Sequence, residues 1–298
     1  MQNSFFIFLN KPIGLTSQQC LSRFKRKYNL KKLGHHGTLD PFADGLLLVG
    51  VNEATKFFSY VLDEQKTYEG SLSLGSATDT LDCTGEVVAE KPVSKLDITQ
   101  IIEIAETFVG LREQVPPMYS AVKINGKKLY EHARQGQTVE RKSRQVTIHE
   151  FAILDYNETT IRFRATVSRG TYIRVLAEEL AKKLGTEGHL TALTRTHLCR
   201  GNLEQAFDMA ADEIPESLKL PISELLEHCP KLQITEEQVK ELFFGREITF
   251  DAESSKEGDQ ALLLHGDQIV GMGEYISAGI LRSRRLMSQN DYNNNDTK

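Results

Sequence analysis

A succession of strand-like segments joined by short turns most constrains what this chain can fold into. The segments RQVTIHEFAIL (144–154) and TTIRFRATVS (159–168) are rich in β-branched and aromatic residues, and DYNE between them is typical of a hairpin. KTYEGSLSLG (66–75) alternates in polarity and ends in glycine, as expected of a strand with one buried face. Helical patterns occur only occasionally between such segments. The order therefore predicts a mixed α/β (α+β) sheet rather than a regular βαβ series.

The remaining apolar segments divide into helices and strands by their spacing. In the first helix, Thr16 or Ser17 can act as the N-cap, because their hydroxyls satisfy free amides of the first turn. A short helix capped by Asn52 is expected next. The predicted helices are residues 14–29, 52–63, 97–110 and 171–185, and the further predicted strands are residues 5–12, 46–49 and 191–201.

The sequence changes character around residues 215–230, where prolines interrupt two short leucine-rich pieces. We place a domain boundary at residue 229. We predict a large N-terminal domain of residues 1–228, a small and mainly β domain of residues 229–285, and a tail of residues 286–298. The tail is polar and rich in asparagine, so we expect it to be disordered.

Composition narrows the class of protein. Hydrophobic residues make up 40% and charged residues 26%, as in ordinary globular proteins, and no apolar run approaches the roughly 18 residues of a membrane span. The N-terminus lacks the basic start and cleavage site of a secretory signal, so we expect a cytoplasmic protein. The cysteines show neither pairing nor metal-ligand spacing, and reduced thiols are expected. They are Cys20, Cys83, Cys199 and Cys229.

Basic residues are concentrated in two segments, although the formal net charge is −5. Residues 22–32 contain six Lys or Arg and no acid, and residues 123–144 are also strongly basic. Such segregation permits a basic nucleic-acid-binding face on an acidic protein. Taken singly, either segment is more typical of a solvated surface than of a binding site.

The segment GHHGTLDPFADGLLLVG (34–50) places one carboxylate, Asp40, in a turn shaped by glycine and proline, just before a buried strand. An Asp followed by Pro is typical of a turn former, and a lone acid at a shaped turn can also be an active-site group. Composition and periodicity alone do not name a reaction.

Five motifs, in one order, resemble the TruB-type tRNA pseudouridine synthases. GHHGTLDPFADGLL (34–47) resembles the family's signature around its catalytic aspartate, and LNKPIGLTS (9–17) resembles its N-terminal motif. QVPPMYSAVKINGKKLYEHARQG (114–136) is similar to its RNA-contacting insertion, and KTYEG (66–70) to its tyrosine strand. SRGTYIRVLAEELAKKLG (168–185) is similar to its arginine motif.

The resemblance implies an isomerase that detaches uracil from its ribose nitrogen and rejoins it through carbon, at uridine 55 in the T-loop of tRNA. That reaction needs no cofactor and no metal. Asp40 would be the nucleophile, at the sugar C1′ or the uracil C6, or would act through a glycal route. Arg174 would lower the pKa of Asp40 as its ion partner, and Tyr68 would stack on the uracil and assist proton transfer. Tyr172 and Leu193 would line the pocket.

The family also implies how the RNA is held. The target base must be flipped out of its stack, and His35 matches the position that fills the resulting gap. An insertion at about residues 114–144 would clamp the RNA through phosphate contacts. The substrate-binding residues implied are His35, Tyr68, Tyr172, Leu193, Lys11, Lys123, Lys127 and Lys128.

The implied fold is a largely antiparallel mixed sheet flanked by helices, with a small PUA-like C-terminal domain. The implied partner is the tRNA T-arm, with no membrane, no obligate protein partner and a monomeric state. His36 and Asp44 stand where the family commonly has small or polar residues. Three alternatives stay open: the guide-RNA-dependent ribosomal branch of the superfamily, a non-catalytic RNA-binding scaffold, and a DNA-binding protein.

Overall fold

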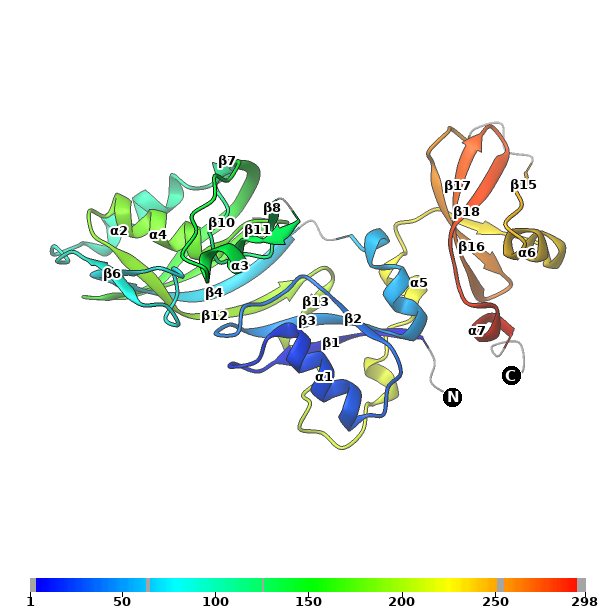
Figure 1. Ribbon diagram of the computed structural model, residues 1–298, viewed down its shortest axis with the longest axis horizontal. Coiled ribbons are helices and arrows are strands. Elements are labelled where there is room, and N and C mark those ends of the chain that lie inside the picture. The colour runs from blue at the N-terminus through cyan, green and yellow to red at the C-terminus, as the bar shows by residue number, and fades with distance from the viewer. Residues whose placement is uncertain (1–3, 63–64, 125, 251–254, 294–298) are drawn as a thin grey trace.

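The computed structural model describes residues 4–62, 65–124, 126–250 and 255–293. A nine-stranded sheet forms the larger part, in the order β1-β3-β12-β4-β11-β10-β7, with β2 and β13 pairing at its side (Figure 1). Its strands are β1 (Phe5–Lys11), β2 (Leu33–His36), β3 (Asp44–Val51), β4 (Gln65–Leu74), β7 (Gly110–Gln114), β10 (Arg144–Asn157), β11 (Thr160–Ser168), β12 (Gly188–Leu198) and β13 (Gly201–Asn202).

The sheet is mixed because of β12, which lies between β3 and β4. It runs antiparallel to β4 along most of its length and meets β3 in a short parallel pairing at Arg195 and Gly45. A side chain at Gly45 would lie 2.4 Å from the Arg195 carbonyl oxygen, and the residue has a φ of +97°, so only glycine fits this close approach. The predicted mixed, largely antiparallel sheet is confirmed, and so is the hairpin of β10 and β11, which turns at residues 158–159.

Helices cover the sheet where its strands carry apolar side chains. Helices α2 (Ile98–Glu106) and α4 (Ile173–Lys183) pack on the part of the sheet that contains β10, β11 and β4. Helix α1 (Ser17–Lys27) buries Cys20, Leu21 and Phe24 against alternate residues of β1. Its N-cap is Thr16, whose side chain accepts from the Gln19 amide in a capping box.

The predicted helix at residues 52–63 differs from the structure. Two 3₁₀ turns, η1 (Asn52–Lys56) and η2 (Phe58–Tyr60), follow β3 directly, and Val51 occupies the N-cap position. Asn52 has a φ of +53°. Asparagine tolerates this left-handed conformation, and here it turns the chain out of the strand instead of capping an α-helix.

Short elements complete the larger part. They include two small hairpins and several single turns. These are β5 (Ser76–Thr78), β6 (Val87–Glu90), β8 (Lys123–Ile124), β9 (Lys127–Lys128), α3 (Leu129–Ala133), η3 (Leu203–Gln205), η4 (Glu216–Leu218) and α5 (Ile222–Leu225).

The C-terminal part is a five-stranded sheet in the order β14-β16-β17-β18-β15 (Figure 1). Its elements are β14 (Lys231–Gln233), α6 (Glu236–Phe243), β15 (Ile248–Thr249), β16 (Gln260–His265), β17 (Gln268–Ser277), β18 (Ile280–Leu286) and α7 (Gln289–Asn293). No helix among the described residues is long and apolar enough to cross a bilayer.

The two parts are joined by a group of polar contacts, which we call the latch, and by an apolar contact. Lys56 Nζ lies 2.6 Å from Glu53 Oε2 and donates to the Leu286 carbonyl at 3.0 Å. Glu53 also accepts from the Ser288 amide. Met287, which lies between Leu286 and Ser288 in the sequence, belongs to the same apolar cluster as Phe6.

The prediction of a disordered tail from residue 286 is wrong for residues 286–293. Leu286 ends a strand, and Met287 and Tyr292 are both buried. These two apolar anchors, spaced within an otherwise polar segment, hold it against the protein. Residues 294–298 of the predicted tail lie outside the described residues.

Candidate active site

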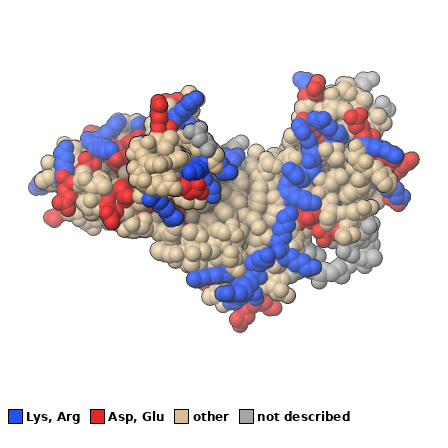
Figure 2. Space-filling view, viewed as in Figure 1, with Lys and Arg blue, Asp and Glu red and all other residues tan. Residues whose placement is uncertain are grey.

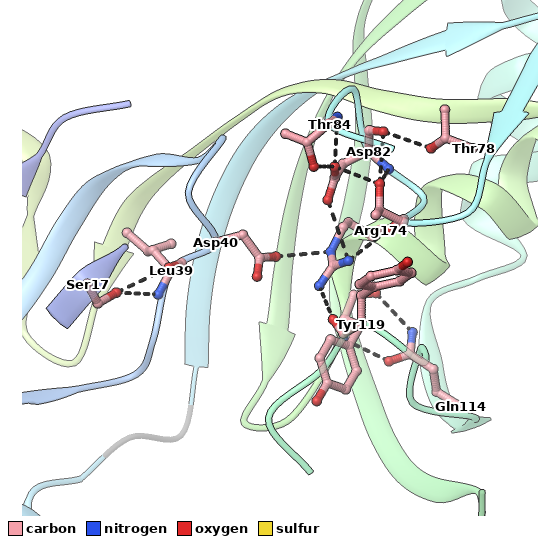
Figure 3. A network of polar contacts seen from close by, with 11 residues as sticks. Ser17, Leu39, Asp40, Thr78, Asp82, Thr84, Gln114, Tyr119 and Arg174 are labelled. Carbon is pink, nitrogen blue, oxygen red and sulfur yellow. Dashed lines mark hydrogen bonds and ion pairs between the residues drawn. The ribbon is translucent and has the colours of Figure 1, made fainter. Parts of the chain in front are cut away.

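Asp40 lies in the loop between β2 and β3, and hydrogen bonds fix the backbone on both sides of it. Ser17 Oγ donates to the Leu39 carbonyl at 3.1 Å and accepts from the Leu39 amide at 2.9 Å (Figure 3). On the other side, the Gly14 amide donates to the Pro41 carbonyl at 2.7 Å. The N-terminal motif therefore serves to hold the loop that carries Asp40.

Arg195 fixes the same loop from the sheet. Its side chain is fully buried, donating from Nε to the Leu46 carbonyl at 2.7 Å and from Nη2 to the Gly37 carbonyl at 2.8 Å. One guanidinium thus ties both ends of the loop. Arg195 was not among the predicted site residues, because an arginine inside a predicted strand carries no signal of a role at a distant loop.

The guanidinium of Arg174 is the centre of the polar network around Asp40 (Figure 3). Its Nε lies 3.0 Å from Asp40 Oδ2, and its Nη1 lies 3.5 Å from Asp82 Oδ2. It also donates to the Thr80 carbonyl at 2.7 Å and to the Tyr119 carbonyl at 2.9 Å. The side chain is only 4% exposed, so this arginine is held by four groups with little freedom to move.

The pKa of the Asp40 carboxyl is subject to opposing electrostatic effects. Burial raises the pKa of its carboxyl above the ordinary 3.8, the Arg174 guanidinium lowers that pKa, and the Asp82 carboxylate raises it again. The net direction is upward. The side chain still has 38% of its surface exposed toward the pocket, so the carboxylate remains open to a ligand.

Asp82 is a second residue that the sequence analysis missed. Its Oδ1 accepts from the hydroxyls of Thr80 at 2.9 Å and Thr84 at 2.6 Å, which orients the other oxygen toward Arg174. The segment ATDTLDCTG carries the signal of a hydrogen-bonded turn, because it is rich in Asp and Thr. Nothing local in that segment indicates that the turn reaches Arg174.

A pocket of about 290 Å³ opens beside Asp40 and Arg174. Tyr68, Leu193 and Tyr172 all line it, as predicted from the sequence, together with Lys66 and Arg169. Its volume is at the lower end of the range of small-molecule pockets, which suits a ligand of nucleoside size.

Tyr172 is held by two side chains. Gln114 accepts from its amide at 2.7 Å and donates to its carbonyl at 3.2 Å, and the Arg144 guanidinium lies 4.6 Å from its ring centroid. Gln114 is itself buried and was not predicted. The aromatic wall of the pocket is therefore fixed before any ligand enters.

His35 lies on β2, beside the loop of Asp40, where its Nε2 is 3.2 Å from Thr38 Oγ1. Burial lowers the pKa of His35, and the nearby Arg195 and His36 lower it further, which favours the neutral ring. Lys123 and Lys127 are exposed on the β8–β9 hairpin, and Lys128 Nζ lies 5.4 Å from the Tyr130 ring centroid.

Lys11 does not lie where the sequence analysis expects it. The residue is fully buried, and its Nζ donates to the carbonyls of Pro12 at 3.0 Å and Leu15 at 2.7 Å. Burial lowers the pKa of this ammonium. Lys11 therefore has a structural role in place of the predicted substrate contact. It stabilises the turn at residues 12–15, and Gly14 of that turn bonds to the loop of Asp40.

The two atypical residues of the signature have separate places. His36 stacks on Phe58, with ring centroids 5.8 Å apart, and Asp44 begins β3 at the edge of a different cavity. Neither lines the pocket of Asp40. Within the described ranges, no cluster of three or more His, Cys, Asp or Glu could hold a metal ion.

Comparison of the fold and the sequence with those of known proteins identifies the class to which this protein belongs. A Cbf5–Nop10–Gar1 complex contains a chain of the same fold, with a TM-score of 0.68 and 24% identity over 97% of this chain and 86% of that one. Residues 25–173 match the TruB family pseudouridylate synthase N-terminal domain, and residues 230–287 match the C-terminal region of pseudouridine synthase II TruB.

Curated relatives agree with these matches. The tRNA pseudouridine synthase B of Cupriavidus metallidurans is 41% identical, and that of Ralstonia pickettii is 43% identical. Each alignment covers 94% of this chain and 93% of the relative. The chain belongs to the TruB family of pseudouridine synthases.

Proposed function

We propose that this chain isomerises uridine 55 in the T-loop of tRNA to pseudouridine, with Asp40 as the nucleophile and the target base flipped into the adjacent pocket. The observation that carries the proposal is the Asp40–Arg174 ion pair of 3.0 Å at the wall of a nucleoside-sized pocket. Relatives with 41–43% identity over most of the chain are named tRNA pseudouridine synthases, which supports tRNA as the substrate.

The side chains around the pocket have distinct roles in this proposal. Arg174 favours the ionised form of Asp40 in a buried site, which attack on C1′ or C6 and a glycal route all require. Tyr68 stacks on the extruded uracil, and Tyr172 and Leu193 complete the walls. His35, neutral and beside the loop, fills the gap that the flipped base leaves.

The rest of the molecule holds the RNA. Lys123, Lys127 and Lys128 contact phosphates from the β8–β9 hairpin, which lies in the insertion of residues 114–144. Figure 2 shows further Lys and Arg side chains gathered over α1 and continuing toward the C-terminal part. The catalytic domain ends near residue 228 and the PUA-like domain follows it. The enzyme works in the cytoplasm as a monomer, without an obligate protein partner, cofactor or metal.

The test is incubation with an unmodified T-arm stem-loop and chemical mapping of pseudouridine at single-nucleotide resolution. Asp40→Asn is the matched variant, because it removes the charge and keeps the shape. Product at position 55 from the wild type only, with RNA affinity of the variant within a few fold, is expected. Product from the variant at the wild-type rate would remove Asp40 from its role. Tight binding without product from either protein would point to a non-catalytic RNA-binding scaffold.

A further inference from the structure

Unpartnered polar atoms gather at the pocket beside Asp40. Among the described residues, the buried side-chain atoms without a hydrogen-bond partner include Ser120 Oγ, Arg144 Nε and Arg195 Nη1. All three residues line this one pocket. Burying a polar group without a partner destabilises a folded protein, so such groups are rare. Because these three residues line the same pocket, we expect a ligand bound there to supply the missing partners.

The chemistry of the three groups restricts that ligand. The two arginine nitrogens can only donate, and a serine hydroxyl can donate or accept. The pocket therefore suits a ligand rich in acceptor oxygens. A uridine offers two carbonyl oxygens on its base, together with the hydroxyl and phosphate oxygens of its backbone.

The backbone of Ser120 is held by two hydrogen bonds. Its amide donates to the Met118 carbonyl at 3.0 Å, and its carbonyl accepts from the Tyr130 amide at 3.1 Å. The carbonyl of the preceding residue, Tyr119, accepts from Arg174 at 2.9 Å (Figure 3). The same guanidinium thus fixes the Asp40 carboxylate and the segment that carries Ser120, which is 6% exposed.

We infer that the Ser120 hydroxyl is a substrate-recognition group that hydrogen-bonds an oxygen of the target nucleoside in the pocket. This inference rests on the proposed function. The oxygen belongs either to the uracil or to the ribose 2′-hydroxyl, since both present the acceptor that the Ser120 hydroxyl lacks. A hydroxyl retained for substrate adds nothing to the stability of the free protein.

The test compares Ser120→Ala with wild type on two T-arm stem-loops, one with uridine and one with 2′-deoxyuridine at the target position. We expect Ser120→Ala to lower kcat/KM on the uridine substrate about 3- to 10-fold, as for loss of one neutral hydrogen bond. An equal loss on both substrates assigns the contact to the uracil, and a loss on the uridine substrate alone assigns it to the 2′-hydroxyl. Ser217→Ala, at an exposed serine, is the control.

Thermal unfolding of the free variants separates recognition from framework. The Tm of Ser120→Ala should equal or exceed that of the wild type, because the change removes an unpaired buried hydroxyl. Unchanged kcat/KM would overturn the inference, and so would a loss of activity accompanied by a lower Tm. If the wild type itself gives no product, the proposed function fails, and that result is distinct from a failure of Ser120 alone.

Discussion

At the scale of single residues, the position of Asp40 depends on a hydroxyl that never reaches the pocket. Ser17 Oγ pairs with both backbone groups of Leu39, and both residues are buried. Ser17 is also the first residue of α1, whose capping box fixes its own position. The first turn of α1 therefore holds the loop of Asp40 in place through one side chain.

We predict that Ser17→Ala lowers the free energy of unfolding by about 1–3 kcal/mol, because two buried backbone groups lose their partner. The variant should also lower kcat more than it raises KM, since the loop of Asp40 loses its anchor. Urea unfolding and steady-state kinetics measure the two effects. Ser22→Ala is the control, because Ser22 is exposed and its hydroxyl donates to the Gln18 carbonyl, and it should change stability by less than about 0.5 kcal/mol.

The raised pKa of Asp40 predicts how activity and stability depend on pH. In the proposed mechanism the ionised carboxylate is the active form, so kcat/KM should fall with acid along a limb centred above pH 3.8. Because the folded-state pKa is above the unfolded value, ionisation of Asp40 opposes folding. Its contribution to stability is complete below pH 3.8 and is lost as pH rises through the folded-state pKa. Asp40→Asn should therefore gain stability relative to wild type as pH rises through that range.

A pH–rate profile and urea unfolding at several pH values measure these two effects. An acid limb centred at or below pH 3.8 would contradict the raised pKa of Asp40. A stability difference between Asp40→Asn and wild type that stays constant across acid pH would contradict the linkage.

At the scale of elements, the β8–β9 hairpin is small but carries the lysines expected to hold phosphate. We predict that the double variant Lys127→Ala and Lys128→Ala weakens RNA binding and reduces the salt slope by about 0.9 for each phosphate that is no longer neutralised. Binding titrations from low to moderate salt measure this. Lys182→Ala is the control, because that lysine is paired with Glu178 on α4. A slope equal to that of wild type would show that the hairpin does not touch phosphate.

The elements themselves were largely predictable, and the contacts between them were not. Alternation identified β4, the turn residues DYNE identified the hairpin of β10 and β11, and Thr16 was one of two candidates for the N-cap of α1, because all three signals are local. Asp82 and Arg195 have no local signal, since each acts on a group more than 90 residues away in the sequence. Lys11 was misplaced because sequence alone cannot show that two carbonyl groups already surround its ammonium.

At the scale of the whole molecule, the latch between Glu53 and the segment after β18 joins the two parts. We predict that Glu53→Ala lowers the free energy of unfolding by about 1–3 kcal/mol, because the Ser288 amide and the Lys56 ammonium lose a buried partner. Urea unfolding measures it. Glu216→Ala is the control, since that glutamate is 80% exposed, and an equal effect of both changes would show that the latch contributes nothing.

The position of β12 has a consequence for how the site comes into being. The loop with Asp40 belongs to β1, β2 and β3, whereas Tyr68 and Arg174 belong to β4 and α4 on the other side of β12. During synthesis, a chain that has grown only to residue 187 already contains all three side chains, but its sheet is still two separate pieces. We therefore expect the site beside Asp40 to form only when β12 enters between the two pieces, although the basic residues of α1 and of the β8–β9 hairpin are present in the growing chain before then.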